Sequence, residues 1–326
     1  MSKELELWQF AADKLKLKKS LILLVVAESS GSSPGRQGFK MIVSQNEMRG
    51  SIGGGVMEIA LAEQAKLRIT NYELRIKNEI IEQIHRKNVP NSSGMICSGR
   101  QKVILFELNS AHLKTIETII YALENQKTCR LQISNSKFQI SDLPSKNGTQ
   151  NTDFNFLQKS ENEFVYEENL GFKHKLFIIG GGHCALALSE IIAKMDFHIA
   201  LFDDREDLNT LAKNDFVHEK KTVESYNQIG DFIESGANVY VVVMTLGYKF
   251  DEIVIRALFD KNFKYFGVLG SKAKMKTLLS SLEKEGFDRE KLVKIKTPIG
   301  LPINSHTPEE IAVSIAAEII SVKNSV

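Results

Sequence analysis

The stretch LFIIGGGHCALAL, residues 176–188, decides the fold of the second half of the chain. An apolar run of strand length precedes three consecutive glycines, and a run with helical character follows them. The glycines and Ala185 match the pattern G-x-G-x-x-G/A, and Asp203 ends the next predicted strand about twenty residues later. This order of strand, glycine loop, helix and acidic strand end is typical of a Rossmann fold that binds a dinucleotide.

Each residue of the fingerprint has a physical task. Gly180 permits the tight turn, and Gly182 lets the backbone approach a pyrophosphate at the helix N-terminus. Asp203 is expected to accept a hydrogen bond from a ribose 2′-hydroxyl of NAD(P) or another nucleotide. His183 is interpreted as a ligand contact, with capping of a backbone group as the alternative. Arg205 pairs either with a ligand phosphate or with a neighbouring carboxylate.

The rest of the second half predicts a doubly wound parallel sheet, because strands alternate with helices. A final helix begins with the capping box Thr307-Pro308-Glu309-Glu310. The predicted strands are residues 176–179, 199–203, 239–244 and 265–268, and the predicted helices between them are residues 184–195, 252–259 and 272–282.

A second glycine loop lies in the first half, at residues 50–55, and it also precedes a predicted helix. Three consecutive glycines lose much backbone entropy when ordered, so either a close ligand or a sharp chain reversal is expected there. Upstream, residues 29–36 form a loop rich in serine and glycine, whose arginine suits a phosphate. The candidate ligand-binding residues of this half are Arg36, Ser51, Gly53, Gly54, Gly55 and Glu58.

The first half also contains clear helix and strand patterns. In the helix after the glycine loop, Val56, Ile59, Ala60 and Leu67 share one face. The remaining predicted helices are residues 4–17 and 113–123, and the predicted strands are residues 21–27, 39–44, 48–52 and 102–108. A polar stretch at residues 141–163 predicts a linker or exposed excursion, with a short strand at residues 164–166.

Composition favours a soluble, cytoplasmic protein of two domains. The chain has 326 residues, 43% of them hydrophobic, which excludes full disorder. The net charge of +2 provides no strong field for nucleic acid or an anionic membrane. The charged start lacks a signal-peptide core, and the apolar run at residues 21–27 is far shorter than the roughly 20 residues that span a bilayer. The expected boundaries are 1–140, a linker at 141–172, and 173–326.

The cysteines exclude a secreted disulfide framework, because only three are present and none forms a CxxC pair. No metal-ligand cluster is apparent either. Cys97 lies in a Ser/Gly-rich turn near Arg100 and is the candidate functional thiol. Cys129 is expected to be structural, and Cys184 to be a buried small hydrophobe.

The chain resembles the XdhC/CoxI family, the xanthine dehydrogenase accessory proteins, along nearly its whole length. The first half carries GSSPGRQGFKMIV (31–43), GSIGGGVMEIALAEQA (50–65) and MICSG (95–99). The second half carries IIGGGHCALAL (178–188), FDDRED (202–207), VVVMT (241–245), GVLGSKAKMK (267–276) and TPIGLPINSHTPEEIAVSIAAEII (297–320). Together these motifs are far more specific than one glycine fingerprint.

The resemblance implies an XdhC-type N-terminal α/β domain joined to a C-terminal Rossmann domain. It also implies that the protein binds the molybdenum cofactor, assists its sulfuration with a cysteine desulfurase, and delivers it to a molybdenum hydroxylase. A homodimer is expected, and Cys97 would contact cofactor or sulfur. The alternatives are an NAD(P)-dependent oxidoreductase and a non-catalytic interaction module with a vacant Rossmann fold.

Two departures from the family pattern bear on these implications. The family commonly has Cys-Gly-Gly where this chain has Cys97-Ser98-Gly99, so the turn has lost one glycine. The family often has Thr-His-Asp-His after the third Rossmann strand, whereas residues 245–248 read Thr-Leu-Gly-Tyr. If those histidines serve a ligand, this chain must hold it differently.

Overall fold

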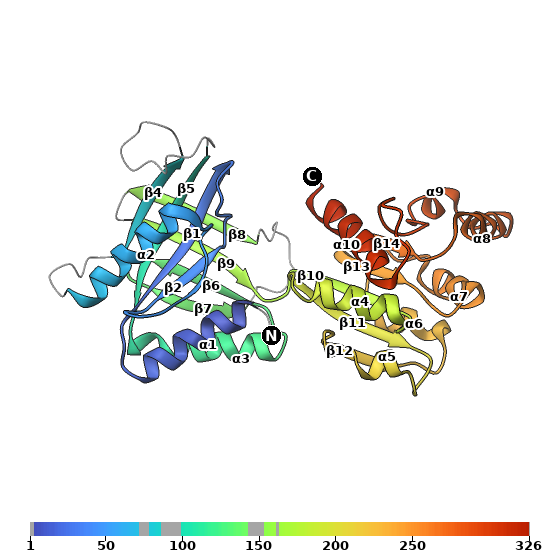
Figure 1. The fold of residues 1–326 in the computed structure, drawn as a ribbon, viewed down its shortest axis with the longest axis horizontal. Coiled ribbons are helices and arrows are strands. Elements are labelled where there is room, and N and C mark those ends of the chain that lie inside the picture. The colour runs from blue at the N-terminus through green and yellow to red at the C-terminus, as the bar shows by residue number, and fades with distance from the viewer. Residues whose placement is uncertain (1–2, 72–77, 86–98, 143–152, 161–162, 326) are drawn as a thin grey trace. The chain divides into compact units, whose positions relative to one another are not determined.

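Two units make up the chain, Met1–Gly171 and Phe172–Val326, called unit 1 and unit 2 below (Figure 1). The computed structural model describes residues 3–71, 78–85, 99–142, 153–160 and 163–325. Unit 1 is built mainly of antiparallel strands, whereas unit 2 contains a parallel sheet. The mixed α/β class expected from the sequence is therefore confirmed.

Unit 1 contains two antiparallel sheets with strand orders β3-β2-β1-β5-β4 and β7-β6-β9-β8. The element order begins with α1 (Lys3–Lys16), β1 (Leu21–Gly31), β2 (Lys40–Val43), β3 (Met48–Gly50), α2 (Gly55–Thr70), β4 (Glu79–His85) and β5 (Gly99–Leu108). It continues with α3 (Leu113–Glu124), β6 (Cys129–Ser134), β7 (Phe138–Asp142), β8 (Phe154–Ser160) and β9 (Glu163–Leu170).

Strand β1 is apolar on both sides because both of its faces are covered. Leu23 and Val25 belong to a core shared with α1, α3 and the second sheet. Leu24 and Val26 belong to a core on the other face, which α2 covers (Figure 1). The continuous apolar run of this strand therefore reflects a sheet sandwiched between two layers.

The polar stretch expected to be a linker forms sheet instead in its described part. Strands β8 and β9 complete the second sheet, and all of β6 pairs with residues 165–170 of β9. The physical reason is that Phe164 and Tyr166 lie on the same side of the strand and enter the core, where both are buried. Unit 1 consequently extends to Gly171 rather than ending near residue 140.

Helix α2 forms where it was predicted, but the face expected from the sequence pattern is not the buried one. Its buried residues are Met57, Leu61, Ala62, Ala65 and Arg68. By contrast, Val56, Ile59 and Leu67 are 67%, 56% and 60% exposed. The helix carries apolar side chains around most of its circumference, so periodicity alone does not identify which face is buried.

Unit 2 is a five-stranded parallel sheet with the order β12-β11-β10-β13-β14. The first elements are β10 (His174–Ile179), α4 (His183–Ile192), β11 (Phe197–Asp203), α5 (Asn209–Ala212), β12 (Glu219–Thr222) and α6 (Ile229–Phe232). The remaining elements are β13 (Gly236–Val243), α7 (Tyr248–Leu258), β14 (Phe263–Val268), α8 (Lys272–Lys284), α9 (Arg289–Leu292) and α10 (Pro308–Asn324).

Helices cover both faces of this sheet, which confirms the doubly wound Rossmann-like architecture. Helices α4 and α10 pack on one face, with Leu188 and Ile315 in that core. Helices α6 to α9 pack on the other face, with Ile255 and Leu278 in theirs. Helix α10 begins with the expected capping box, in which the Thr307 hydroxyl and the Glu310 side chain are both engaged. No helix among the described residues is long and apolar enough to cross a membrane.

Candidate functional site

The centre of unit 2 is the point where the strand order reverses. Strand β10 lies between β11 and β13, so the loop after β10 opens between the carboxyl ends of all three. Gly180 has φ +103°, and a Cβ there would lie 2.3 Å from the Met244 carbonyl oxygen after β13. The tight turn therefore requires glycine at this position both for its φ angle and for the close approach of two loops.

The Asp203 side chain forms all of its described hydrogen bonds within the protein. Its side chain is fully buried, and Oδ2 accepts a hydrogen bond from the Gly181 amide at 2.6 Å. Arg205 donates through Nε to Oδ1 and through Nη2 to Oδ2, both at 2.8 Å. Burial would raise the pKa of Asp203, but these donors outweigh it and lower the pKa. The Asp203 carboxylate, which was expected to accept a hydrogen bond from a ribose, is therefore bonded to Gly181 and Arg205. Of the two partners expected for Arg205, a ligand phosphate or a neighbouring carboxylate, the structure shows the carboxylate.

A cavity of about 400 Å³ opens beside this loop. It is lined by the first residues of α4 and by the loops after β11 and β13, including Gly182, His183, Arg205, Asn209, Thr245 and Leu246. A Cβ on Gly182 would meet no atom within 4 Å, so the space in front of the loop is open. No side chain caps the first turn of α4. Its free amides and positive dipole end are suited to an anion.

The loop after β13 is held by a residue that the sequence reasoning missed. The buried Asp251 accepts from the Thr245 hydroxyl at 2.6 Å through Oδ1. Burial raises the pKa of Asp251 above its ordinary value. Leu246 is 74% exposed and lies on the cavity wall. Asp251 lies in the first turn of α7, and an acidic residue at a helix start was the sequence feature that could have pointed to it.

The glycine loop of unit 1 is also organised by a carboxylate. Glu58 Oε2 accepts from the Ser51 hydroxyl at 2.6 Å and from the amides of Ile52 and Gly54 at 2.8 and 2.9 Å. Partial burial would raise the pKa of Glu58, yet these hydrogen bonds lower it. The three glycines therefore form a sharp chain reversal. The amides of Ile52 and Gly54 donate to Glu58 and are already engaged within the protein.

Two loops of unit 1 that are distant in sequence touch through their backbones. A Cβ on Gly53 would lie 2.4 Å from the Gly35 nitrogen, and one on Gly35 would lie 2.2 Å from the Ile52 oxygen. Beneath them, Gln101 Oε1 accepts from the Ser33 hydroxyl at 2.8 Å in a buried network that the sequence did not reveal. Gly55 has φ +75° where α2 begins. The exposed Arg36 donates to the Gly31 carbonyl at 3.4 Å.

The described cysteines are not activated thiols. Burial raises the pKa of Cys129 to about 11, and burial also raises the pKa of the half-buried Cys184. Cys97, the candidate functional thiol, lies outside the described residues. Within the described ranges, no group of three or more His, Cys, Asp or Glu side chains could hold a metal ion.

Comparisons with known proteins agree with this architecture. A family model described as the XdhC Rossmann domain matches residues 176–319, and one described as the XdhC and CoxI family matches residues 15–75. The chain is 24% identical to a probable xanthine dehydrogenase subunit of Bacillus subtilis, with 96% of both chains covered. It is 29% identical over 159 residues to the uncharacterized protein YqeB of Escherichia coli, but that match spans only 28% of YqeB.

A solved structure shares the fold over nearly the whole chain. The crystal structure of a xanthine dehydrogenase from Bacillus halodurans superposes with a TM-score of 0.73 at 19% identity, covering 99% of this chain and 96% of the other. The two family models fall on the two halves that carry the glycine loops. Together with the Rossmann topology of unit 2, these matches show that the chain belongs to the XdhC/CoxI family.

Proposed function

We propose that this chain is an accessory protein of a xanthine-dehydrogenase-type molybdenum hydroxylase, which binds the molybdenum cofactor and hands it to that enzyme. The names of the relatives and the family membership support the accessory role. In this proposal a cysteine desulfurase is the second partner and supplies sulfur to the bound cofactor. The proposed working form is a cytoplasmic homodimer.

The observation that carries the proposal is the cavity at the carboxyl ends of the unit 2 strands. The cofactor combines a phosphate with a hydrogen-bonding heterocycle, and the cavity offers a partner for each. The uncapped first turn of α4 and the open space at Gly182 suit the phosphate. Asn209 provides an amide group on the cavity wall, whereas the hydroxyl of the neighbouring Thr210 donates to the Gly181 carbonyl at 2.5 Å and supports the loop. The volume of about 400 Å³ lies in the range of ordinary small-molecule sites.

Arg205 lines this cavity, and its charge is paired with the buried Asp203. Its Nε and Nη2 donate to Asp203, and within the described residues Nη1 has no protein partner. The ion pair with Asp203 holds the guanidinium in one orientation, so that Nη1 can donate to a ligand anion without further ordering. When bound, the cofactor supplies the molybdenum chemistry. The protein residues orient the phosphate and leave the metal end available to a partner.

The oxidoreductase alternative lacks its usual nucleotide recognition here. A nicotinamide dinucleotide depends on an acidic residue that accepts from the ribose, but Asp203 is buried and bonded to Gly181 and Arg205. The interaction-module alternative is tested by the same experiment, because it predicts no small ligand at all.

The test is direct binding of isolated molybdopterin and, separately, of NAD and NADP to the purified chain. We expect molybdopterin to raise the melting temperature and to remain bound on gel filtration. Binding of NAD without binding of molybdopterin would replace the proposal by the oxidoreductase alternative, and binding of neither would support the interaction module. Light scattering on the same sample measures whether the chain is a dimer.

A further inference from the structure

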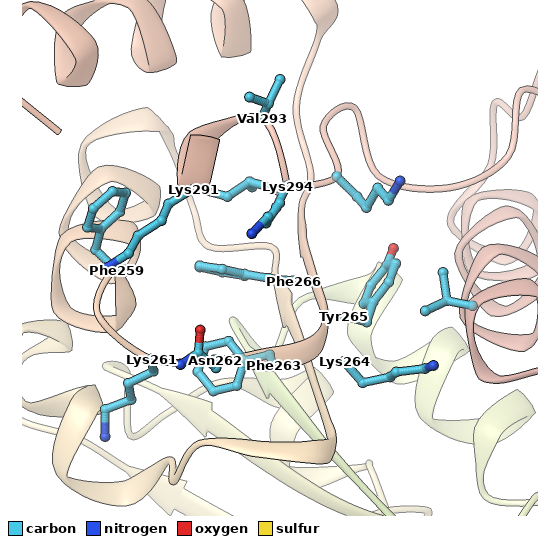
Figure 2. A pocket seen from close by; sticks show the side chains of 13 residues that line it. Phe259, Lys261, Asn262, Phe263, Lys264, Tyr265, Phe266, Lys291, Val293 and Lys294 are labelled. Carbon is cyan, nitrogen blue, oxygen red and sulfur yellow. The ribbon is translucent and has the colours of Figure 1, made fainter. Parts of the chain in front are cut away.

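A second cavity, of about 430 Å³, lies beside the first half of the edge strand β14, away from the carboxyl strand ends where the first cavity opens (Figure 2). The segment at residues 294–296 runs along the free side of this strand. The Lys296 amide donates to the Phe266 carbonyl at 2.8 Å, and the Lys296 carbonyl accepts from the Val268 amide at 2.9 Å. The cavity is thus built from regular backbone on two sides, and we call it the β14 groove.

The β14 groove is strongly cationic, because five lysines and no acidic residue line it. Two of the five are already engaged. Lys291 Nζ donates to Asp260 at 2.9 Å, and Lys261 donates to backbone carbonyls of the α6 region. In the part of the chain that the structure describes, Lys264, Lys294 and Lys296 are exposed and their side chains make no hydrogen bond or ion pair. Three lysines whose side chains have no partner among the described residues therefore line one cavity.

Aromatic rings form the apolar part of the same groove. Phe263 and Phe266 meet edge to face with centroids 5.7 Å apart, and both are half-buried. Figure 2 shows the Phe266 ring lying across the groove, with the Lys294 side chain directed toward it. Val293 stands at the rim and is 72% exposed. The groove consequently combines an apolar floor with a positively charged rim, as in many protein docking sites.

The charge distribution favours a polypeptide over a nucleic acid. Unit 2 has 20 basic and 21 acidic residues, so the groove is a local concentration of charge in an almost neutral body. Such a body lacks the extended positive track that a polyanionic strand needs. The groove also has no glycine loop or arginine for bidentate phosphate binding. Lysines act as flexible point charges, which suits carboxylates spaced along a peptide.

We propose that the β14 groove is a docking site for an acidic segment of a partner protein, one that carries Asp or Glu residues next to an aromatic or aliphatic side chain. The apolar side chain contacts Phe263 and Phe266, and the carboxylates pair with Lys264, Lys294 and Lys296. Because the groove lies away from the carboxyl ends of the strands, the docked partner leaves the cavity at Gly182 accessible. This site is independent of the ligand in that cavity.

The test uses a fluorescent hexapeptide, Glu-Phe-Glu-Glu-Phe-Glu, titrated with the full chain and followed by anisotropy. We expect saturable binding that weakens when salt rises from about 50 mM to about 500 mM. The variant Lys264→Glu/Lys294→Glu/Lys296→Glu should lose at least about tenfold in affinity, because each rim charge now repels the peptide. All three lysines are exposed, so circular dichroism and melting temperature should stay close to those of the parent.

The matched control is Lys213→Glu/Lys276→Glu/Lys284→Glu, which makes the same charge change at exposed lysines that line neither cavity. It should bind the peptide with an affinity close to that of the parent chain. Equal binding by the groove variant and the parent would overturn the proposal. Tighter binding of a thymidine hexanucleotide than of the peptide would also overturn it, in favour of a nucleic-acid site. Gly182→Asp should leave peptide binding unchanged, which separates this site from the cofactor cavity.

Discussion

Gly182→Asp should weaken ligand binding in the unit 2 cavity about 100-fold and at the same time stabilise the empty protein. Gly182 is the N-cap residue of α4, with φ −69° and ψ −170°, and its Cβ would enter open space. An aspartate can therefore be placed there without strain. Its carboxylate would accept from the free amides of the first turn, which are the groups assigned to the ligand phosphate.

The two effects have opposite signs and calculable sizes. An aspartate cap and its interaction with the helix dipole should add about 0.5–1 kcal/mol to the free energy of unfolding. A carboxylate roughly 6 Å from one negative charge of the ligand costs about 3 kcal/mol at an effective dielectric constant near 20. That cost corresponds to a loss of about 100-fold in affinity.

The assay is thermal unfolding of the purified chain with and without molybdopterin. The empty variant should melt about 1–4 °C above the parent. At the same ligand concentration, the rise in melting temperature caused by ligand should be much smaller in the variant than in the parent. Gly182→Asn is the matched control, because it adds a cap of the same size without charge and should retain more of the ligand affinity. An unchanged ligand shift in Gly182→Asp would refute the placement of the ligand at α4. Equal losses in both variants would refute the electrostatic reasoning.

Three further predictions concern the supports of the two units. Gly180→Ala should lower the free energy of unfolding by about 2–4 kcal/mol, because its Cβ would lie 2.3 Å from the Met244 oxygen at a positive φ; no change in urea unfolding would contradict this. The pKa of Asp203 is lowered in the folded state, so its contribution to stability is complete above its unfolded-state pKa and is lost as pH falls through the folded-state pKa. In Asp203→Asn the melting temperature should therefore depend less on pH below about pH 4 than in the parent. Melting temperatures of variant and parent that fall in parallel with pH would contradict this. Lys40→Met should lower the free energy of unfolding by about 3–5 kcal/mol, because Glu168 would stay buried without its cation. Denaturant unfolding followed by the fluorescence of the single tryptophan, which lies in unit 1, measures this change, and a midpoint equal to that of the parent would contradict it.

Unit 2 could be predicted from the sequence because its determinants are local. The glycine turn after β10 and the capping box of α10 each occupy a few consecutive residues, and the apolar run of β10 identifies a buried parallel strand. The hydrogen-bond partners of its polar side chains were harder to predict. Asp203 was assigned to a ribose because its place at a strand end is local information, whereas its burial depends on how Arg205 and Gly181 fold around it.

The second sheet of unit 1 could not be predicted for the opposite reason. Strand β9 includes Glu168, which a local pattern assigns to solvent, yet only 3% of this residue is exposed. Its partner Lys40 lies 128 positions earlier in the chain, and Nζ reaches Glu168 Oε2 at 2.7 Å. Burial opposes the charge on Lys40, but Glu168 and Glu4 raise its pKa well above the ordinary value. Polar residues buried as such pairs look like surface residues in the sequence.

The two glycine loops share one device, and it bears on what each can bind. In each loop a carboxylate of the protein itself accepts hydrogen bonds from backbone amides, Glu58 in unit 1 and Asp203 in unit 2. In unit 1 Glu58 lies in the first turn of α2 and takes the amides of Ile52 and Gly54, so the loop is closed by its own helix. In unit 2 Asp203 takes only the Gly181 amide from the loop, and the start of α4 stays uncapped. An anionic ligand therefore finds free donors at the unit 2 loop, whereas at the unit 1 loop it would have to displace Glu58.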